Sequence, residues 1–145
     1  MAAMSNYLEN KVIDWFFRAQ TFTPPAGLHV GLLTSAPSDT GGGTEVSGNA
    51  YARQNLAPSL TNWAGTQGAG STSTSSGTNG TTSNNGIITF PTPTASWGTV
   101  THFAIYDAST GGNLLWYGAL QIAKTINQGD TVTFPAASLT VQIDD

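Results

Sequence analysis

The chain has 145 residues but only 12 charged ones (4 Lys or Arg and 8 Asp or Glu), a formal net charge of −4 and no cysteine. Four fixed cations cannot neutralise a run of phosphates, so this composition excludes electrostatic nucleic-acid binding and disfavours an anionic membrane surface. The lack of cysteine excludes thiol catalysis, disulfide bonds and thiolate metal sites.

Length and composition indicate one β-rich domain. A chain of this length buries roughly two thirds of its unfolded surface, so we expect a single domain over residues 1–145. Gly, Ser, Thr and Asn are frequent, which suits strands and turns rather than helices. No apolar run approaches a membrane span, and charges interrupt the N-terminal segment before a signal-peptide core forms. We expect a soluble protein made in a cytoplasm, with no membrane contact.

An amphipathic helix is predicted over about 5–19. Asn6 followed by Glu9 suggests a capping pair, and two prolines after Thr23 prevent the helix from continuing. We expect the helix to cover the open end of a β-sandwich; the alternative is a helix that docks onto a neighbouring subunit. The apolar positions that recur at helical spacing are Leu8, Val12, Trp15, Phe16 and Ala19, widened by Ile13 and Phe17.

Strands are predicted after the helix, separated by turn signals. Apolar or alternating runs that favour strands lie at 28–34, 51–57, 87–90, 97–107, 113–126 with a break near Ala123, 131–134 and 138–143. The turns at 107–113 and 127–130 predict two hairpins. Strands that follow one another without intervening helices indicate an all-β, antiparallel sandwich behind one N-terminal α-helix.

Two loops stand out by composition. In 65–86, 20 of 22 residues are Gly, Ser, Thr or Asn and none is charged. Such a loop cannot form a core, so backbone and hydroxyl hydrogen bonds must hold it, with a neighbouring subunit as the expected contact. The loop 38–50 is glycine-rich and acidic. Arg53, an isolated cation, is expected to pair with Glu45 of that loop.

The sequence predicts no enzyme. The histidines His29 and His102 lie in predicted strands and lack a third ligand at a metal-binding spacing. The carboxylates that could act as a catalytic pair lie in predicted turns, where aspartate is common for backbone hydrogen bonding; they are Asp39, Glu45, Asp107 and Asp130. No phosphate loop or nucleophile motif is present. We expect no cofactor and no metal.

The aromatic residues allow two interpretations. Trp97, Trp116 and Tyr117 lie in predicted strands, so core packing is expected; the alternative is a platform that stacks on sugar rings. Exposed aromatics beside Asn and Asp in one groove would favour glycan recognition. Two carboxylates that converge in a cleft would instead favour a glycan-degrading enzyme.

Several strings together resemble a family of small tailed-phage virion proteins, which genomes label as tail fibre or head proteins. They cover nearly the whole chain except 65–86, which resembles an insertion. The strings are SNYLENKVIDWFFR, LHVGLLTSAPSD, GGGTEVSGNAYARQ, ITFPTPTASWGTVTHFAIYDASTGGNLLWYGAL and KTINQGDTVTFPAASLTVQID.

The resemblance implies a jelly-roll-like sandwich that is present in many copies in the virion and binds other virion proteins. We expect first a capsid decoration (cement) protein that binds and stabilises the major capsid protein shell, and also expect a homo-oligomer, a dimer or trimer. The alternative is a tail-fibre or neck module that binds host cell-surface glycan. The expected contact regions are the helix and the loops 38–50 and 65–86; the expected interface residues are Tyr7, Trp15, Phe16, Glu45, Tyr51, Arg53, Trp63 and Asn79.

Overall fold

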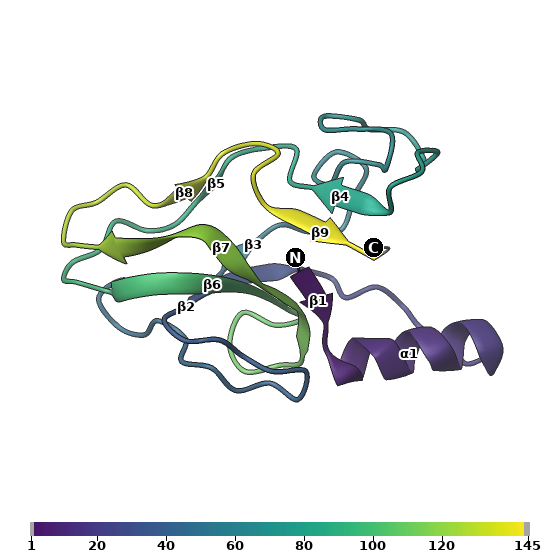
Figure 1. The fold of residues 1–145 in the computed structure, drawn as a ribbon, viewed down its shortest axis with the longest axis horizontal. Helices are drawn as coiled ribbons and strands as arrows, with labels where there is room; N and C mark the ends of the chain where they lie inside the picture. Colours follow the sequence, from purple (N-terminus) through teal and green to yellow (C-terminus); the bar gives the residue numbers. More distant parts are fainter. Residues whose placement is uncertain (1, 144–145) are drawn as a thin grey trace.

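The chain is mostly β-structure with one helix near the N-terminus, as predicted (Figure 1). The computed structural model describes residues 2–143, so the ends of the predicted domain, residues 1 and 144–145, lie outside the described part. The elements are β1 (Ala2–Met4), α1 (Asn6–Phe17), β2 (His29–Leu33), β3 (Gln54–Asn55), β4 (Thr81–Ser83), β5 (Ile88–Thr89), β6 (Gly98–Tyr106), β7 (Leu114–Ile126), β8 (Thr133–Phe134) and β9 (Thr140–Gln142).

All strand pairs are antiparallel, and they form one large sheet and two short ladders. The large sheet has the order β1-β7-β6-β2-β3, with the long β6–β7 hairpin at its centre. The ladders β4-β9 and β5-β8 each join strands that are distant in sequence. This arrangement confirms the antiparallel all-β class; the jelly-roll connectivity is not confirmed by this strand order.

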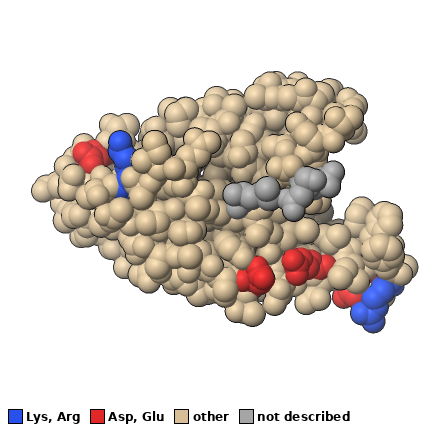
Figure 2. Space-filling model, in the orientation of Figure 1, with Lys and Arg blue, Asp and Glu red and all other residues tan. Residues whose placement is uncertain are grey.

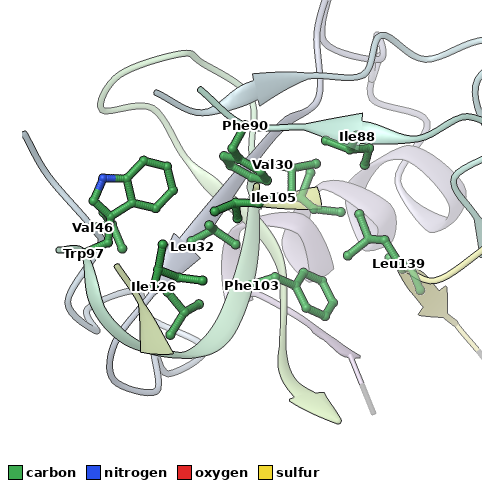
Figure 3. Packing of buried hydrophobic residues seen from close by; sticks show 13 residues of the cluster. Val30, Leu32, Val46, Ile88, Phe90, Trp97, Phe103, Ile105, Ile126 and Leu139 are labelled. Carbon is green, nitrogen blue, oxygen red and sulfur yellow. The ribbon is translucent and has the colours of Figure 1, made fainter. Parts of the chain in front are cut away.

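The hydrophobic core lies between the large sheet and the segments that carry the short ladders (Figure 3). Val30 and Ile105 come from the large sheet, while Ile88 and Leu139 come from the opposite layer, and all four are buried. Because successive strand residues face opposite sides, each strand contributes alternate side chains to this core. Trp97 is also buried there, as expected for a core tryptophan.

Several predicted strands differ from the observed ones. In 51–57 only Gln54–Asn55 form a strand, because Tyr51 and Arg53 turn toward the loop 38–50 instead of pairing. The predicted break near Ala123 is not an end of β7, but residues 120–123 have no partner on β6, where the register shifts. The turn at 127–130 forms, yet it is not a hairpin, since β8 pairs with β5 rather than with β7.

The loop 65–86 is more ordered than its composition suggests. It contains β4, and Asn84 is completely buried although no core was predicted there. The Asn84 amide donates to the carbonyls of Gly86 (2.7 Å) and Pro135 (2.8 Å), and its oxygen accepts from the Leu139 N–H (2.9 Å). Hydroxyl and backbone hydrogen bonds do hold the loop, as expected, but they are made within the chain.

Candidate interaction surfaces

Helix α1 is attached to the body of the protein by its first turn. Ser5 is the N-cap: its hydroxyl accepts from the Leu8 N–H (3.3 Å) and donates to the carbonyl of Leu114, the first residue of β7. The observed N-cap is therefore Ser5, one residue before the predicted N-cap Asn6. Glu9 lies in the first helical turn. The helix ends at Phe17, and the N–H of the C-cap residue Arg18 donates to the Asp14 carbonyl.

The outer half of α1 projects from the body and is apolar (Figure 1). Of residues 12–17 only Asp14 is polar. Leu8 is the buried residue of the helix, whereas Trp15, Phe16 and Phe17 are 53%, 69% and 76% exposed. The prediction that the apolar stripe covers the sandwich is wrong, because Leu8 alone of its large apolar side chains is buried and those from Val12 onward are exposed. We call Val12, Ile13, Trp15, Phe16 and Phe17 the apolar helix surface.

The Phe16 ring of the apolar helix surface contacts the rings of Trp15 and Phe17. The centroids of Trp15 and Phe16 lie 6.0 Å apart and those of Phe16 and Phe17 5.1 Å apart, both edge to face. Near them, the exposed Arg18 guanidinium pairs with the Asp14 carboxylate at 2.8 Å. In Figure 2, blue and red atoms lie together at the lower right, where α1 projects in Figure 1. Two of the predicted interface residues, Trp15 and Phe16, thus lie on a real exposed surface.

Arg53, Glu45 and Tyr51 form a network inside the chain. Arg53 donates from Nε to Glu45 Oε1 and from Nη2 to Glu45 Oε2, both at 2.7 Å, so the expected ion pair is present and bidentate. The Tyr51 hydroxyl also donates to Glu45 (2.7 Å) and accepts from the Leu32 N–H (2.9 Å). These polar atoms are already partnered, so we assign these three residues a structural role.

The network also reaches the turn between β6 and β7. Arg53 Nη1 donates to the carbonyls of Ala108 and Gly111, each at 2.8 Å, and its guanidinium lies 3.4 Å from the centroid of the Tyr106 ring. One side chain therefore joins the loop 38–50 to the β6–β7 hairpin. The planar, permanently charged guanidinium suits this position because it can bond to a carboxylate and stack on a ring at once.

Burial and neighbouring charges shift the pKa of the network's groups. Burial raises the pKa of Tyr51 far above its ordinary 10.0, and Glu45 raises it further, although the bond from the Leu32 N–H opposes this. Burial by itself would lower the pKa of Arg53, but its bonds and charge interaction with Glu45 raise it. The pKa of Tyr106 is raised mainly by burial. At neutral pH Tyr51 and Tyr106 are thus neutral and Arg53 is charged.

The other predicted interface residues have different environments. Trp63 is partly buried at the edge of the core, and its indole N–H donates to the Leu56 carbonyl (3.1 Å). Asn79 is exposed in the loop 65–86, where its side chain accepts from the Thr81 N–H in a local turn. Tyr7 is half-buried near the start of α1. Asn79 and Tyr7 therefore lie at accessible positions, whereas Trp63 serves packing.

A polar groove of about 400 Å³ lies where the start of α1, the loop after β2 and the β6–β7 turn meet. Its lining combines two tyrosine rings with one carboxylate and two amide side chains, and these come from Tyr7, Tyr106, Asp39, Asn6 and Asn113. Asp39 accepts a hydrogen bond from Tyr117, which raises the pKa of Tyr117 to about 12. Sequence analysis missed this groove because its residues are spread over three distant segments.

An apolar groove of about 840 Å³ follows the outer half of β7. It lies between Leu120 and Ile122 on one side and Phe134 of β8 on the other, with Lys124 and Asp130 also in its lining. Residues 120–123 pair with neither β6 nor β1, and Ile122 is strongly exposed. This strand segment is a second accessible apolar surface, on a different element from α1.

Comparison with known proteins gives the family. The family model described as Podophage GP4 fiber I protein gp80 matches residues 3–142, nearly the whole chain. The chain belongs to this family. No curated protein matches it.

Family membership confirms the resemblance to tailed-phage virion proteins. The protein is a phage structural protein of a fibre-related family, which fits a location in the virion. Among residues 2–143, no helix has both the length and the apolar character needed to cross a bilayer. In the same residues, no group of three His, Asp or Glu side chains could hold a metal ion.

Proposed function

We propose that this protein is a fibre-associated structural component of a phage virion and acts by binding other virion proteins rather than by catalysis. The observation that carries the proposal is the apolar helix surface, which stands clear of the body (Figure 1). The side chains of Trp15, Phe16 and Phe17 each have about 200 Å² of surface. Since 53%, 69% and 76% of these surfaces are exposed, together they present about 400 Å² of apolar area to solvent. The largest exposed apolar patch of a soluble protein, usually about 300–600 Å², is often functional, and binding of another protein is one such function.

The body supports this proposal because side-chain hydrogen bonds cross-link its loops. The Arg53 network joins two loops, and the buried Asn84 amide joins the loop 65–86 to the C-terminal segment. A rigid body with one projecting apolar helix suits a part that is attached to a larger assembly. A purely structural role also fits the two grooves, since the lining of each contains a single carboxylate, Asp39 or Asp130. Glycoside hydrolysis usually needs two.

The position in the virion is proposed from the family description, which names a fibre protein. Shell decoration, with the major capsid protein as partner, is the alternative position. The two differ in copy number: decoration needs hundreds of copies, whereas a fibre or neck needs at most a few dozen. Quantitative mass spectrometry of purified virions measures this number, and we expect the low value.

The binding role of α1 is tested in the phage that encodes the protein. The variant Phe16→Ser/Phe17→Ser removes two exposed rings, so the fold should be retained while incorporation into virions falls at least tenfold. Leu60→Ser is the matched control, because it removes a large exposed apolar side chain from another segment. Virions that contain the double variant at the normal level would refute the role of α1, and virions without the wild-type protein would refute the proposed function.

A second candidate function is favoured by the polar groove. Aromatic rings beside Asn and Asp side chains are what a sugar-binding site requires, since sugar hydroxyls need donors and acceptors and sugar C–H faces pack on rings. Glucose, galactose, rhamnose and N-acetylglucosamine are suitable probes in saturation-transfer NMR. We expect transfer to at least one sugar and its loss in Tyr7→Ala. Absence of transfer to all four would remove this candidate.

A further inference from the structure

We infer that the partner of the apolar helix surface is the same surface on further copies of this chain, so that α1 helices form a small symmetric cluster joining the copies. The inference rests on the proposed role of α1 as a docking element, and it names the partner. Three observations favour a second copy over a different protein.

The first observation is the width of the apolar helix surface. With about 100° between successive residues, its side chains span roughly 200° of the helix circumference, from Trp15 to Phe17. A helix that lies on one flat surface needs a stripe of only about 100°. A wider stripe is buried when a helix has neighbours on two sides, as in a helical bundle.

The second observation is the distribution of exposed apolar residues. Five of the nine large exposed apolar side chains in the described residues lie on α1, and the other four lie on four separate segments. On an identical copy, the largest group of exposed apolar side chains is therefore the one on α1 itself. Association through the same surface gives closed symmetry, the usual form of soluble oligomers.

The third observation is charge. Residues 6–18 contain two acids (Glu9 and Asp14) and two cations (Lys11 and Arg18), so this segment is neutral, while the whole chain has a net charge of −4. The remainder of the chain thus has the entire charge of −4, and contact between the acidic bodies is disfavoured. Because this segment is neutral and α1 projects from the body (Figure 1), helices can meet while the bodies stay apart.

The area is sufficient for an association of moderate strength. The three rings provide about 400 Å² on each copy, about half of the ~800 Å² that each partner contributes to a standard interface. Val12 and Ile13 add to this area. We therefore expect an equilibrium that shifts with protein concentration rather than a permanent oligomer.

Sedimentation equilibrium of the purified full chain over a wide concentration range tests the inference. We expect the wild-type molar mass to rise to at least twice that of one chain. The Phe16→Ser/Phe17→Ser variant should stay monomeric with an unchanged circular dichroism spectrum and melting temperature, and Leu60→Ser should behave as wild type. A wild-type protein that is monomeric throughout would overturn the inference, as would a double variant that associates like wild type.

The virion experiment separates this inference from the proposed function. If the wild-type chain is monomeric but its incorporation into virions still requires the two phenylalanines, the partner of α1 is another virion protein. That result would refute self-association through α1 and leave the proposed function intact. If the chain associates through α1 but is absent from virions, the reverse holds.

Discussion

Replacing Arg53 by methionine should destabilise the fold strongly. The Arg53 side chain is only 8% exposed, and the change removes two bonds to Glu45 and two to backbone carbonyls. Removal of one partner from a buried ion pair typically costs about 3–5 kcal/mol. Because the Glu45 side chain is 25% exposed and can recover some hydration, we expect the lower end of that range, about 3 kcal/mol. At about 3 °C for each kcal/mol, the melting temperature should fall by roughly 9 °C.

The measurement is urea unfolding followed by circular dichroism and tryptophan fluorescence. Arg18→Met is the matched control, since Arg18 also pairs with a carboxylate at 2.8 Å but its side chain is 71% exposed. A pair of that kind is worth less than about 0.5 kcal/mol. The double variant Arg53→Met/Glu45→Met should recover part of the loss, because no unpaired charge is left. If Arg53→Met and Arg18→Met had equal effects, the assignment of Arg53 as the main link between the two loops would be wrong.

Three further predictions concern pH, a buried amide and a turn. The hydrogen bond to Asp39 raises the pKa of Tyr117 to about 12 in the folded protein. The stabilisation from the protonated Tyr117 is therefore complete below pH 10.0 and is lost as the pH rises toward 12. In alkaline unfolding curves, Tyr117→Phe should not show this loss of stability. Asn84→Ala removes three hydrogen bonds and leaves the Gly86 carbonyl and the Leu139 N–H without the Asn84 partner, while the Pro135 carbonyl keeps its bonds from Ser138. We expect the unfolding free energy to fall by about 3 kcal/mol, whereas Asn79→Ala, at an exposed position, should change it by less than about 0.5 kcal/mol; urea unfolding measures both. Gly43→Ala should lower the melting temperature more than Gly42→Ala. Both glycines have positive φ, but only at Gly43 would an added Cβ meet neighbouring atoms, the nearest at 2.8 Å. Equal effects would show that backbone strain alone accounts for the loss of stability.

The helix and the long strands could be predicted because their signals are local. Apolar residues at helical spacing between Leu8 and Phe17 marked α1, and continuous apolar runs marked β2, β6 and β7. The Arg53–Glu45 pair was also predictable. A lone cation in a nearly uncharged chain has few acids to pair with, and Glu45 lies only 8 residues away.

The short elements could not be predicted because distant residues create them. Strand β1 is three residues without any pattern, and it pairs with β7 because Gly118 leaves space: a Cβ there would lie 3.1 Å from the Ala2 Cα and 2.9 Å from the Phe103 ring. Asn84 lies in a run of polar residues that looked unable to form a core. Its burial follows from the approach of 135–139, which presents matching backbone groups.

In the apolar helix surface, too, one part could be predicted from the local sequence and another part depends on the tertiary structure. The apolar character of residues 12–17 was plain in the sequence, but the amphipathic pattern is the same for a helix that covers its own sheet and for one that binds a partner. The structure shows the second of these arrangements. The Ser5 hydroxyl attaches the first turn of α1 to β7, and the rest of the helix projects from the body (Figure 1).

The sequence by itself determined the secondary-structure class, the position of the helix, the phage virion family and the scarcity of charge, since each depends on composition or on neighbouring residues. Only the tertiary structure decided which apolar residues are buried and which are left for a partner. Burial depends on which segments meet in space, and here the sheets cover one another while the outer half of α1 is left uncovered.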